Sequence, residues 1–351
     1  MYRLRYLVRY VRAEVAPLPS RGIVLGFVLF LLVLPLVSQE PNLLRLIIVT
    51  SLFALYASSW DLLAGYTGQV SLGHALFFGS GAYASALLGW HLALPPSLTI
   101  PAGAAVATAL GLLVGVPCLR LRGHYLALAT LAFPIMLTGL VLAFPSFTGG
   151  EGGIWRIARL TPVRVREYYL IVGVVLGALF ALGQLANSRL GLIFHAIRED
   201  ETAARALGID TVRYKLLAFA LSGFAAGLAG ALYAHSSAAR IVAPGPVLGL
   251  LVSFQPIIWT IFGGTATIWG PVVGVFVLYP LLDLLNVLIP QYRMLLFALL
   301  VLLILRFMPG GFGTWIRDRI EEVCPSCRVR NASWRPSCRA CGVGLRPQSP
   351  R

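Results

Sequence analysis

The run YYLIVGVVLGALFALGQLAN at residues 168–187 carries no charged side chain over 20 positions, which is enough for one helix across the hydrocarbon core of a bilayer. The whole chain has a similar composition. Of its 351 residues 58% are hydrophobic and only 12% are charged, whereas about a quarter of the residues in soluble domains are charged. This excludes an ordinary soluble domain and predicts an all-α polytopic membrane protein.

Apolar runs bounded by polar residues, prolines or glycines predict about ten transmembrane helices, some of them broken or short. These runs cover residues 22–38, 43–63, 70–94, 98–119, 124–144, 168–187, 216–235, 251–263, 270–289 and 292–308. Of the 28 Lys and Arg residues, 21 fall on one side of this topology and 7 on the other. Because cytoplasmic loops carry the excess of positive charge, both termini are predicted to be cytoplasmic.

The predicted topology divides the chain into four parts. A basic cytoplasmic N-terminus, residues 1–21, precedes a transmembrane domain over residues 22–312. That domain contains a cytoplasmic loop at residues 188–215, and a cysteine-containing tail follows at residues 322–351. Lys215 is the only lysine and lies outside any GxxxxGK[ST] sequence, so the chain is not expected to hydrolyse ATP through a P-loop.

Two glycine-rich polar runs, residues 65–83 and 262–271, lie beside predicted membrane helices. Irregular backbone at membrane depth is tolerated where protein or water satisfies its amides, and helix N-termini exposed there attract carboxylates. We therefore expect a substrate pathway in these runs. Its candidate residues are Gly68, Gln69, Ser71, Gly73, His74, Gly79, Gly81, Gly263, Gly264 and Thr265. Close helix packing by small residues is the alternative.

Other polar residues in the spans leave further alternatives open. Asp61 and Asp283 are candidates for binding a cation or a substrate ammonium group, unless they lie near the membrane interface. Ser71 and His74 stand three residues apart and could act as nucleophile and base of an intramembrane hydrolase. Asp61 is the only evident orienting acid for such a pair.

The cytoplasmic loop contains IREDETAARALGID at residues 197–210, a pattern typical of a short surface helix. Glu201 and Arg205 stand at i and i+4, Gly208 is a natural helix stop, and Asp210 or Thr211 could cap the next helix. Such a helix suits docking into a groove of a cytoplasmic partner. A solvated loop is the alternative.

Four segments stand in order along the chain: LLAGYTGQVSLGHA at 62–75, LRGHYLALATL at 121–131, TGGEGGI at 148–154, and GGT at 263–265 followed by Gly270-Pro271. They resemble the permease subunits of branched-chain amino-acid ABC importers, most closely the larger of the two. The resemblance runs from about residue 43 to 312. TAARALG at 202–208 is similar to the EAAxxxG loop of these permeases, with Thr202 in the place of the glutamate.

This resemblance implies a subunit that moves branched-chain or related amino acids inward across a bacterial or archaeal cytoplasmic (inner) membrane. The implied partners are a second homologous permease subunit, ABC ATPase subunits that hydrolyse the ATP, an extracytoplasmic solute-binding protein and membrane lipids. Coupling to the ATPase would fall to Glu201, Thr202, Ala203, Ala204 and Gly208. A permease for urea or short amides is the alternative within transport, and a passive solute channel is the alternative of another class.

The tail departs from these permeases, with CPSC at residues 324–327 and CRAC at residues 338–341. Two CxxC pairs at this spacing are typical of zinc ribbons. The expected ligands of a structural zinc ion are Cys324, Cys327, Cys338 and Cys341. Disulfides are disfavoured in a reducing cytoplasm. The many arginines of the tail suit anionic lipid headgroups or the ATPase, with nucleic acid an unlikely partner.

Overall fold

The computed structural model describes residues 19–118, 121, 124–155, 157–236, 241–307, 310–333, 335, 337, 338 and 340–345. Most of the predicted N-terminal part, up to residue 18, and the tail beyond residue 345 lie outside this range. The chain forms two compact units. The larger unit is Glu40–Phe312, and the smaller contains the chain before residue 40 and after residue 312.

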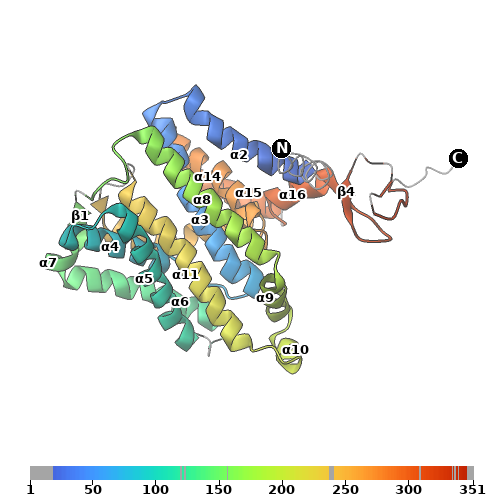
Figure 1. Cartoon of the computed structure of the whole chain (residues 1–351), viewed down its shortest axis with the longest axis horizontal. Helices are drawn as coiled ribbons and strands as arrows, with labels where there is room; N and C mark the ends of the chain where they lie inside the picture. Colours follow the sequence, from blue (N-terminus) through green and yellow to red (C-terminus); the bar gives the residue numbers. More distant parts are fainter. Residues whose placement is uncertain are drawn as a thin grey trace, which may run out of the picture. The chain divides into compact units, whose positions relative to one another are not determined.

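The larger unit is a helical bundle (Figure 1). Its helices are α3 (Pro41–Asp61), η2 (Leu62–Tyr66), α4 (Ala75–Leu92), α5 (Pro96–Cys118), α6 (His124–Ala143), α7 (Pro145–Thr148), η3 (Gly150–Gly152), α8 (Arg164–Ala186), α9 (Arg189–Glu199), α10 (Glu201–Ala206), α11 (Thr211–His235), α12 (Pro244–Leu248), α13 (Leu250–Gly263), α14 (Trp269–Leu288) and α15 (Arg293–Phe307). Two short antiparallel strands, β1 (Ile154–Trp155) and β2 (Ile241–Val242), pair between loops.

Helix α3 lies at the centre of this unit. In an 18-residue apolar stretch of its span 89% of the residues are buried by the protein itself, against 22% in the corresponding stretch of α6, so α3 is enclosed by protein while α6 presents most of its surface outward. Phe53 of α3 anchors an aromatic cluster, with its ring 5.9 Å from Phe78 and 5.1 Å from Trp259. Stacked and tilted rings of this kind stabilise a buried core.

Helices α4, α5 and α11 pack closely through small residues. A Cβ on Gly81 of α4 would lie 2.2 Å from the carbonyl oxygen of Gly227 on α11, and one on Gly227 would lie 2.2 Å from Cβ of Ala107 on α5. Glycine at these crossings allows the backbones to approach to a distance that any side chain would prevent.

Among the residues that the structure describes, seven helical segments are long and apolar enough to cross a membrane. They are Pro41–Tyr66, Pro96–Cys118, Tyr125–Ala143, Arg164–Ala186, Thr211–His235, Pro244–Gly263 and Trp269–Leu288. The predicted helical membrane class is thus confirmed, but ten crossings are not. The other three predicted spans contain α2 (Pro19–Val37), α4 and α15, and the 15 residues of α15 would extend only about 22 Å at 1.5 Å per residue.

The smaller unit contains α2, the amphipathic helix α16 (Phe312–Ile320) and the strands β3 (Glu321–Val323) and β4 (Arg330–Ala332). The two strands pair antiparallel, with Glu322 opposite Asn331. Arg330 lies 3.6 Å from the carboxylate of Asp318 and 3.8 Å from that of Glu321, so the hairpin is tied to the helix before it.

Candidate functional site

The short helix predicted within residues 197–210 is present as α10, and both of its ends are capped. Asp200 separates it from α9, and its Oδ1 accepts hydrogen bonds from the backbone N–H of Thr202 at 2.8 Å and of Ala203 at 3.0 Å. At the other end Gly208 has φ +85°, and its N–H donates to the carbonyl of Arg205 at 2.9 Å. Gly208 is therefore the helix stop that the sequence predicted.

Glu201 fixes α10 to the start of α11. One carboxylate oxygen lies 2.7 Å from Nζ of Lys215, and the other bonds to Arg205 and accepts from the hydroxyl of Thr211 at 3.3 Å. Burial opposes ionisation of Glu201, but the hydrogen bond and charge of Lys215, with the charge of Arg205, outweigh it and lower the pKa of Glu201. The carboxylate is thus a tether within the chain.

The exposed surface of α10 consists of other residues. Thr202, Ala203 and Gly208 are exposed, whereas Ala204 is buried. Leu207, which sequence reasoning had not singled out, is 83% exposed at the tip. The sequence could have indicated this exposure, because a leucine directly before a helix-stopping glycine in a polar loop has no apolar core to pack into. A single exposed leucine is common on protein surfaces, so Leu207 is a candidate contact residue through its place on α10.

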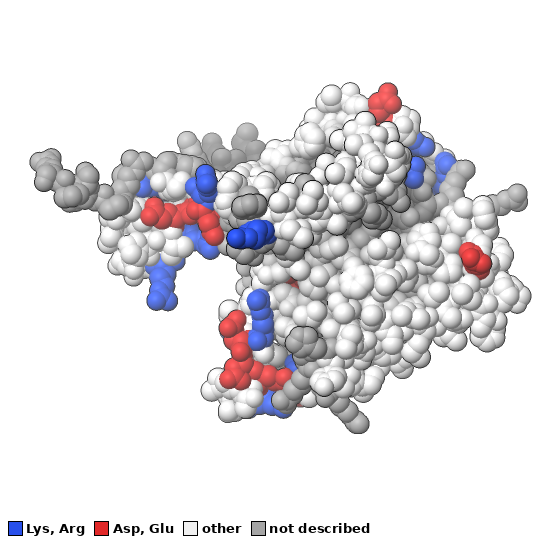
Figure 2. Space-filling model, turned by 180° about the vertical axis from the view of Figure 1, so that it is seen from behind, with Lys and Arg blue, Asp and Glu red and all other residues white. Residues whose placement is uncertain are grey.

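Charged residues are few over most of the face drawn in Figure 2, and residues of both signs gather at the end of the bundle that carries α9 and α10. This end also holds the turns of both glycine runs. Asp61, at the end of α3, is buried, and its two carboxylate oxygens accept the backbone N–H groups of Ala266 at 2.8 Å and Thr267 at 2.9 Å. The two runs, far apart in sequence, meet through this carboxylate.

The polar candidates of the first run are buried and hydrogen-bonded locally. Gln69 donates to the hydroxyl of Thr67 at 3.0 Å, and the carbonyl of Ser71 accepts from Trp60 at 2.7 Å. Nε2 of His74 lies 2.9 Å from the hydroxyl of Ser59. No contact among the described residues pairs His74 with Ser71, so the geometry does not support a hydrolase.

Several candidate glycines lie where segments approach closely. An added Cβ would lie 1.8 to 2.2 Å from a neighbouring residue at each of Gly73, Gly79, Gly81 and Gly263. Gly68 and Gly264 have φ +72° and +113°, and Thr265 is exposed beside them. Close packing accounts for glycine at the first four positions and backbone conformation at the other two. Whether these ten residues line a substrate pathway stays a prediction.

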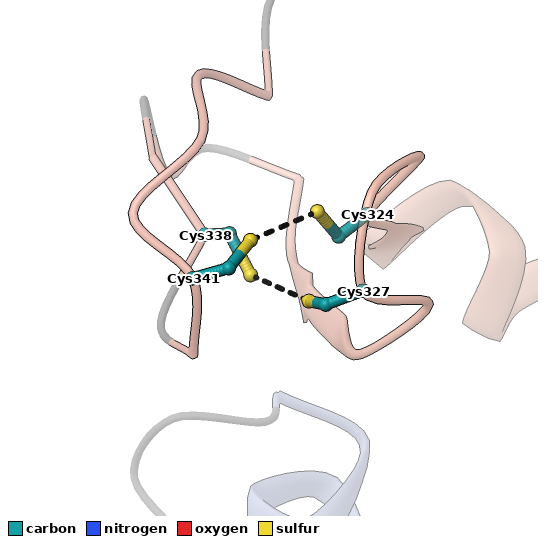
Figure 3. A group of neighbouring side chains, drawn as sticks. All are labelled: Cys324, Cys327, Cys338 and Cys341. Carbon is teal, nitrogen blue, oxygen red and sulfur yellow. Dashed lines mark hydrogen bonds between the residues drawn. The ribbon is translucent and has the colours of Figure 1, made fainter.

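The four tail cysteines come together as one cluster. Their sulfur atoms all lie within 4.8 Å of one another, with Sγ of Cys324 3.6 Å from that of Cys341 and Sγ of Cys327 3.4 Å from that of Cys338 (Figure 3). Four thiolates around one tetrahedral zinc ion, at a Zn–S distance of about 2.3 Å, stand about 3.8 Å apart. The cluster therefore has the size that a single metal ion requires.

Both CxxC turns have the same backbone conformation. The N–H of Cys324 donates to the carbonyl of Val329 at 3.0 Å, and the N–H of Cys338 donates to that of Val343 at 2.8 Å. The residue after the second cysteine has positive φ in each, +57° at Arg328 and +71° at Gly342.

Hydrogen bonds favour the thiolate of Cys338 in this cluster. Backbone N–H groups of Cys341 and Ala340 lower the pKa of Cys338 to about 6. Asn331 contributes a side-chain N–H 3.5 Å from the same sulfur. N–H donors to sulfur are the outer contacts that stabilise metal-binding thiolates.

Comparison with known proteins identifies the larger unit. The sequence model of the family described as "Branched-chain amino acid transport system / permease component" matches residues 42–305. The high-affinity branched-chain amino acid transport system permease proteins LivM of Salmonella typhimurium and Escherichia coli are each 29% identical over 302 residues, covering 78% of this chain and 70% of LivM. The ribose import permease protein RbsC of Escherichia coli is 27% identical over 279 residues, covering 75% of this chain and 84% of RbsC. The chain therefore belongs to the family of branched-chain amino acid transport system permease components.

Proposed function

We propose that this chain is the permease subunit of an ABC importer that moves branched-chain or related amino acids inward across the cytoplasmic membrane. Membership of the family and the likeness to LivM support the substrate class, although the likeness to RbsC shows that related permeases serve sugars too. ATP hydrolysis belongs to separate ATPase subunits. A second homologous permease subunit and an extracytoplasmic solute-binding protein complete the importer, and both termini of this chain are cytoplasmic.

The geometry of α10 is the observation that carries this proposal. A docking helix must be held firmly to its own subunit and must present a surface to another, and α10 meets both conditions. Glu201 holds it to α11 through Lys215, while Thr202, Ala203 and Leu207 are exposed. We assign α10 as the coupling helix that docks into the ATPase.

Transport by the reconstituted importer tests this function. Proteoliposomes would contain this chain, its partner permease and the ATPase subunits, with the solute-binding protein outside. Uptake of radiolabelled leucine that depends on both ATP and the binding protein is expected. Uptake of urea or ribose in place of leucine would assign the importer to a different substrate class. Uptake that persists without ATP would identify a passive channel instead.

The four tail cysteines would hold a structural zinc ion. The buried core around them consists of Cys324, Cys338 and Leu345, with Cys327 and Val329 packed against it. Because three of these five residues are proposed ligands, metal binding has to supply most of the folding free energy of this segment.

The metal content of the purified full-length protein tests the zinc site. About one zinc ion per chain is expected for the wild type and for Cys118→Ser, the matched control in α5, because four thiolates complete a single tetrahedral site. Cys338→Ser should lose the metal. Equal zinc content in all three proteins would contradict the assignment. Disulfides among these cysteines in protein purified from cells with a reducing cytosol would contradict it too.

A further inference from the structure

Helix α9 runs directly into the proposed coupling helix and is tied to the end of α3. In Figure 1 α9 lies beside the end of α3, where the chain forms the π-helical turn η2. Arg198, one residue before the end of α9, donates from Nη1 to the carbonyl of Gly65 in η2. The ring of His195, also on α9, lies 4.8 Å from the ring of Tyr66. A displacement of α9 therefore acts directly on η2.

The tie continues from η2 to the second glycine run. Asp61, the last residue of α3, accepts the N–H groups of Ala266 and Thr267 in the turn between α13 and α14. Ser58, one turn earlier, donates to the carbonyl of Ile268 at 3.0 Å. The end of α3 thus holds this turn by three hydrogen bonds.

Burial makes the hydrogen bonds of this junction important. Asp61 is fully buried, so its carboxylate oxygens depend on the N–H groups of Ala266 and Thr267. A buried carboxylate is costly unless hydrogen bonds and a nearby opposite charge compensate it. Gly65 makes the arrangement sterically feasible, because a Cβ there would lie 2.0 Å from Oδ1 of Asp61.

The surrounding backbone is suited to move as a hinge. Single π turns inside helices often occur at functional sites. Gly68 and Gly264 adopt positive φ on either side of the junction. Gly68 also lies against Arg198, since an added Cβ would be 3.4 Å from its Cγ. Fixed polar contacts are therefore joined to segments that can absorb a change of φ and ψ.

We propose that Arg198 and Asp61 are positioning residues that transmit the displacement of the coupling helix to the two glycine turns, so that both turns move together when the ATPase closes. This inference rests on the proposed function of α10 as the coupling helix. An anchor that only stabilised the fold would leave the amount of ATP hydrolysed per molecule transported unchanged. A transmitting junction would change it.

The test is the ratio of ATP hydrolysed to leucine taken up by the reconstituted importer. Arg198→Gln should keep ATPase activity close to that of the wild type and lower leucine uptake about tenfold or more, so the ratio rises by the same factor. Asp61→Asn should do the same, because it keeps one acceptor oxygen and loses the charge. Arg189→Gln, an exposed arginine at the start of α9, is the matched control and should leave the ratio unchanged.

Arg198→Lys provides a further variant if the importer that carries Asp61→Asn does not assemble. A lysine retains the charge and can reach the carbonyl of Gly65, so it should recover part of the coupling that Arg198→Gln loses. An unchanged ratio in an assembled Arg198→Gln transporter, or the same rise in Arg189→Gln, would overturn the inference. Absence of ATP-dependent uptake in the wild type would instead refute the proposed function.

Discussion

Replacing Glu201 by glutamine should release α10 from α11 without unfolding the bundle. The carboxylate lies 2.7 Å from Nζ of Lys215, and the two side chains are only 22% and 13% exposed. Breaking a fully buried pair costs about 3–5 kcal/mol, and an exposed pair contributes only about 0–1 kcal/mol. For this half-buried pair, with the exposed Arg205 adding little, we expect a loss of about 2 kcal/mol.

A loss of about 2 kcal/mol raises the population of detached α10 about thirtyfold, since each 1.4 kcal/mol is a factor of ten. Amide hydrogen exchange of residues 203–209, followed by mass spectrometry, measures this population directly. Thr202→Ala is the control, because Thr202 lies on the same helix and is exposed. If both variants exchange at the wild-type rate, Glu201 does not anchor the helix.

The pH dependence of the same measurement follows from the lowered pKa of Glu201. A carboxylate whose pKa is lower in the folded state stabilises that state above its ordinary pKa of 4.5, and the stabilisation is lost as the pH falls through the folded value. Protection of residues 203–209, corrected for intrinsic exchange, should therefore stay constant from about pH 8 to 5.5 and be lost only in strong acid. A loss near neutral pH would contradict this assignment.

Substitutions at three further places test the geometry. Leu207→Asp should weaken binding of the ATPase about tenfold or more, because the side chain is 83% exposed and a leucine buried at an interface contributes about 1.5–3 kcal/mol; an unchanged Kd would remove Leu207 from the interface. Gly65→Ala should lower the melting temperature of the transporter, because its Cβ would lie 2.0 Å from a carboxylate oxygen, whereas Gly173→Ala, with nothing within 4 Å, should not. Arg328→Gly should strengthen zinc binding by about 1 kcal/mol and Gly342→Ala should weaken it, because both positions have positive φ, which glycine adopts without strain. Removal of zinc with a chelator measures both changes, and the opposite order would refute the strain argument.

The helices were largely predictable because their apolar residues follow from the need to avoid water at membrane depth. The run at 168–187 corresponds to α8, Arg164–Ala186. Hydropathy alone fails where hydrogen bonding sets the boundary of a helix. The apolar span was predicted from residue 216, whereas helix α11 begins at Thr211, because the side chain of Asp210 caps it at the N–H of Arg213 and the polar residues that follow stay helical. The cap itself was predicted, since Asp210 was one of the two capping candidates.

For the candidate sites, too, contacts that are local in the sequence could be predicted, and long-range contacts could not. The four cysteines could be grouped from sequence because each CxxC pair is a single turn and the two pairs are close along the chain. The contact of Asp61 with Ala266 and Thr267 spans more than 200 residues and has no local signal. Lys215 marked the absence of a P-loop in the sequence, whereas in the structure it is the partner of Glu201. Asp200 as a cap was overlooked, although an aspartate before a short helix is a common start signal.

In α10, anchoring the helix and contacting a partner fall to two different residues, although one residue could have done both. Successive residues of a helix point about 100° apart, so a carboxylate at residue 202 would face away from the position that Glu201 occupies. Glu201 reaches Lys215 and Thr211, and Thr202 is exposed. In this chain the charged residue therefore holds the helix in place, and the short polar side chain of the next residue is left exposed. We infer that the ATPase contacts Thr202, Ala203 and Leu207 on a surface that also carries the exposed side chain of Arg205, so binding combines apolar contact with a charge that salt screens.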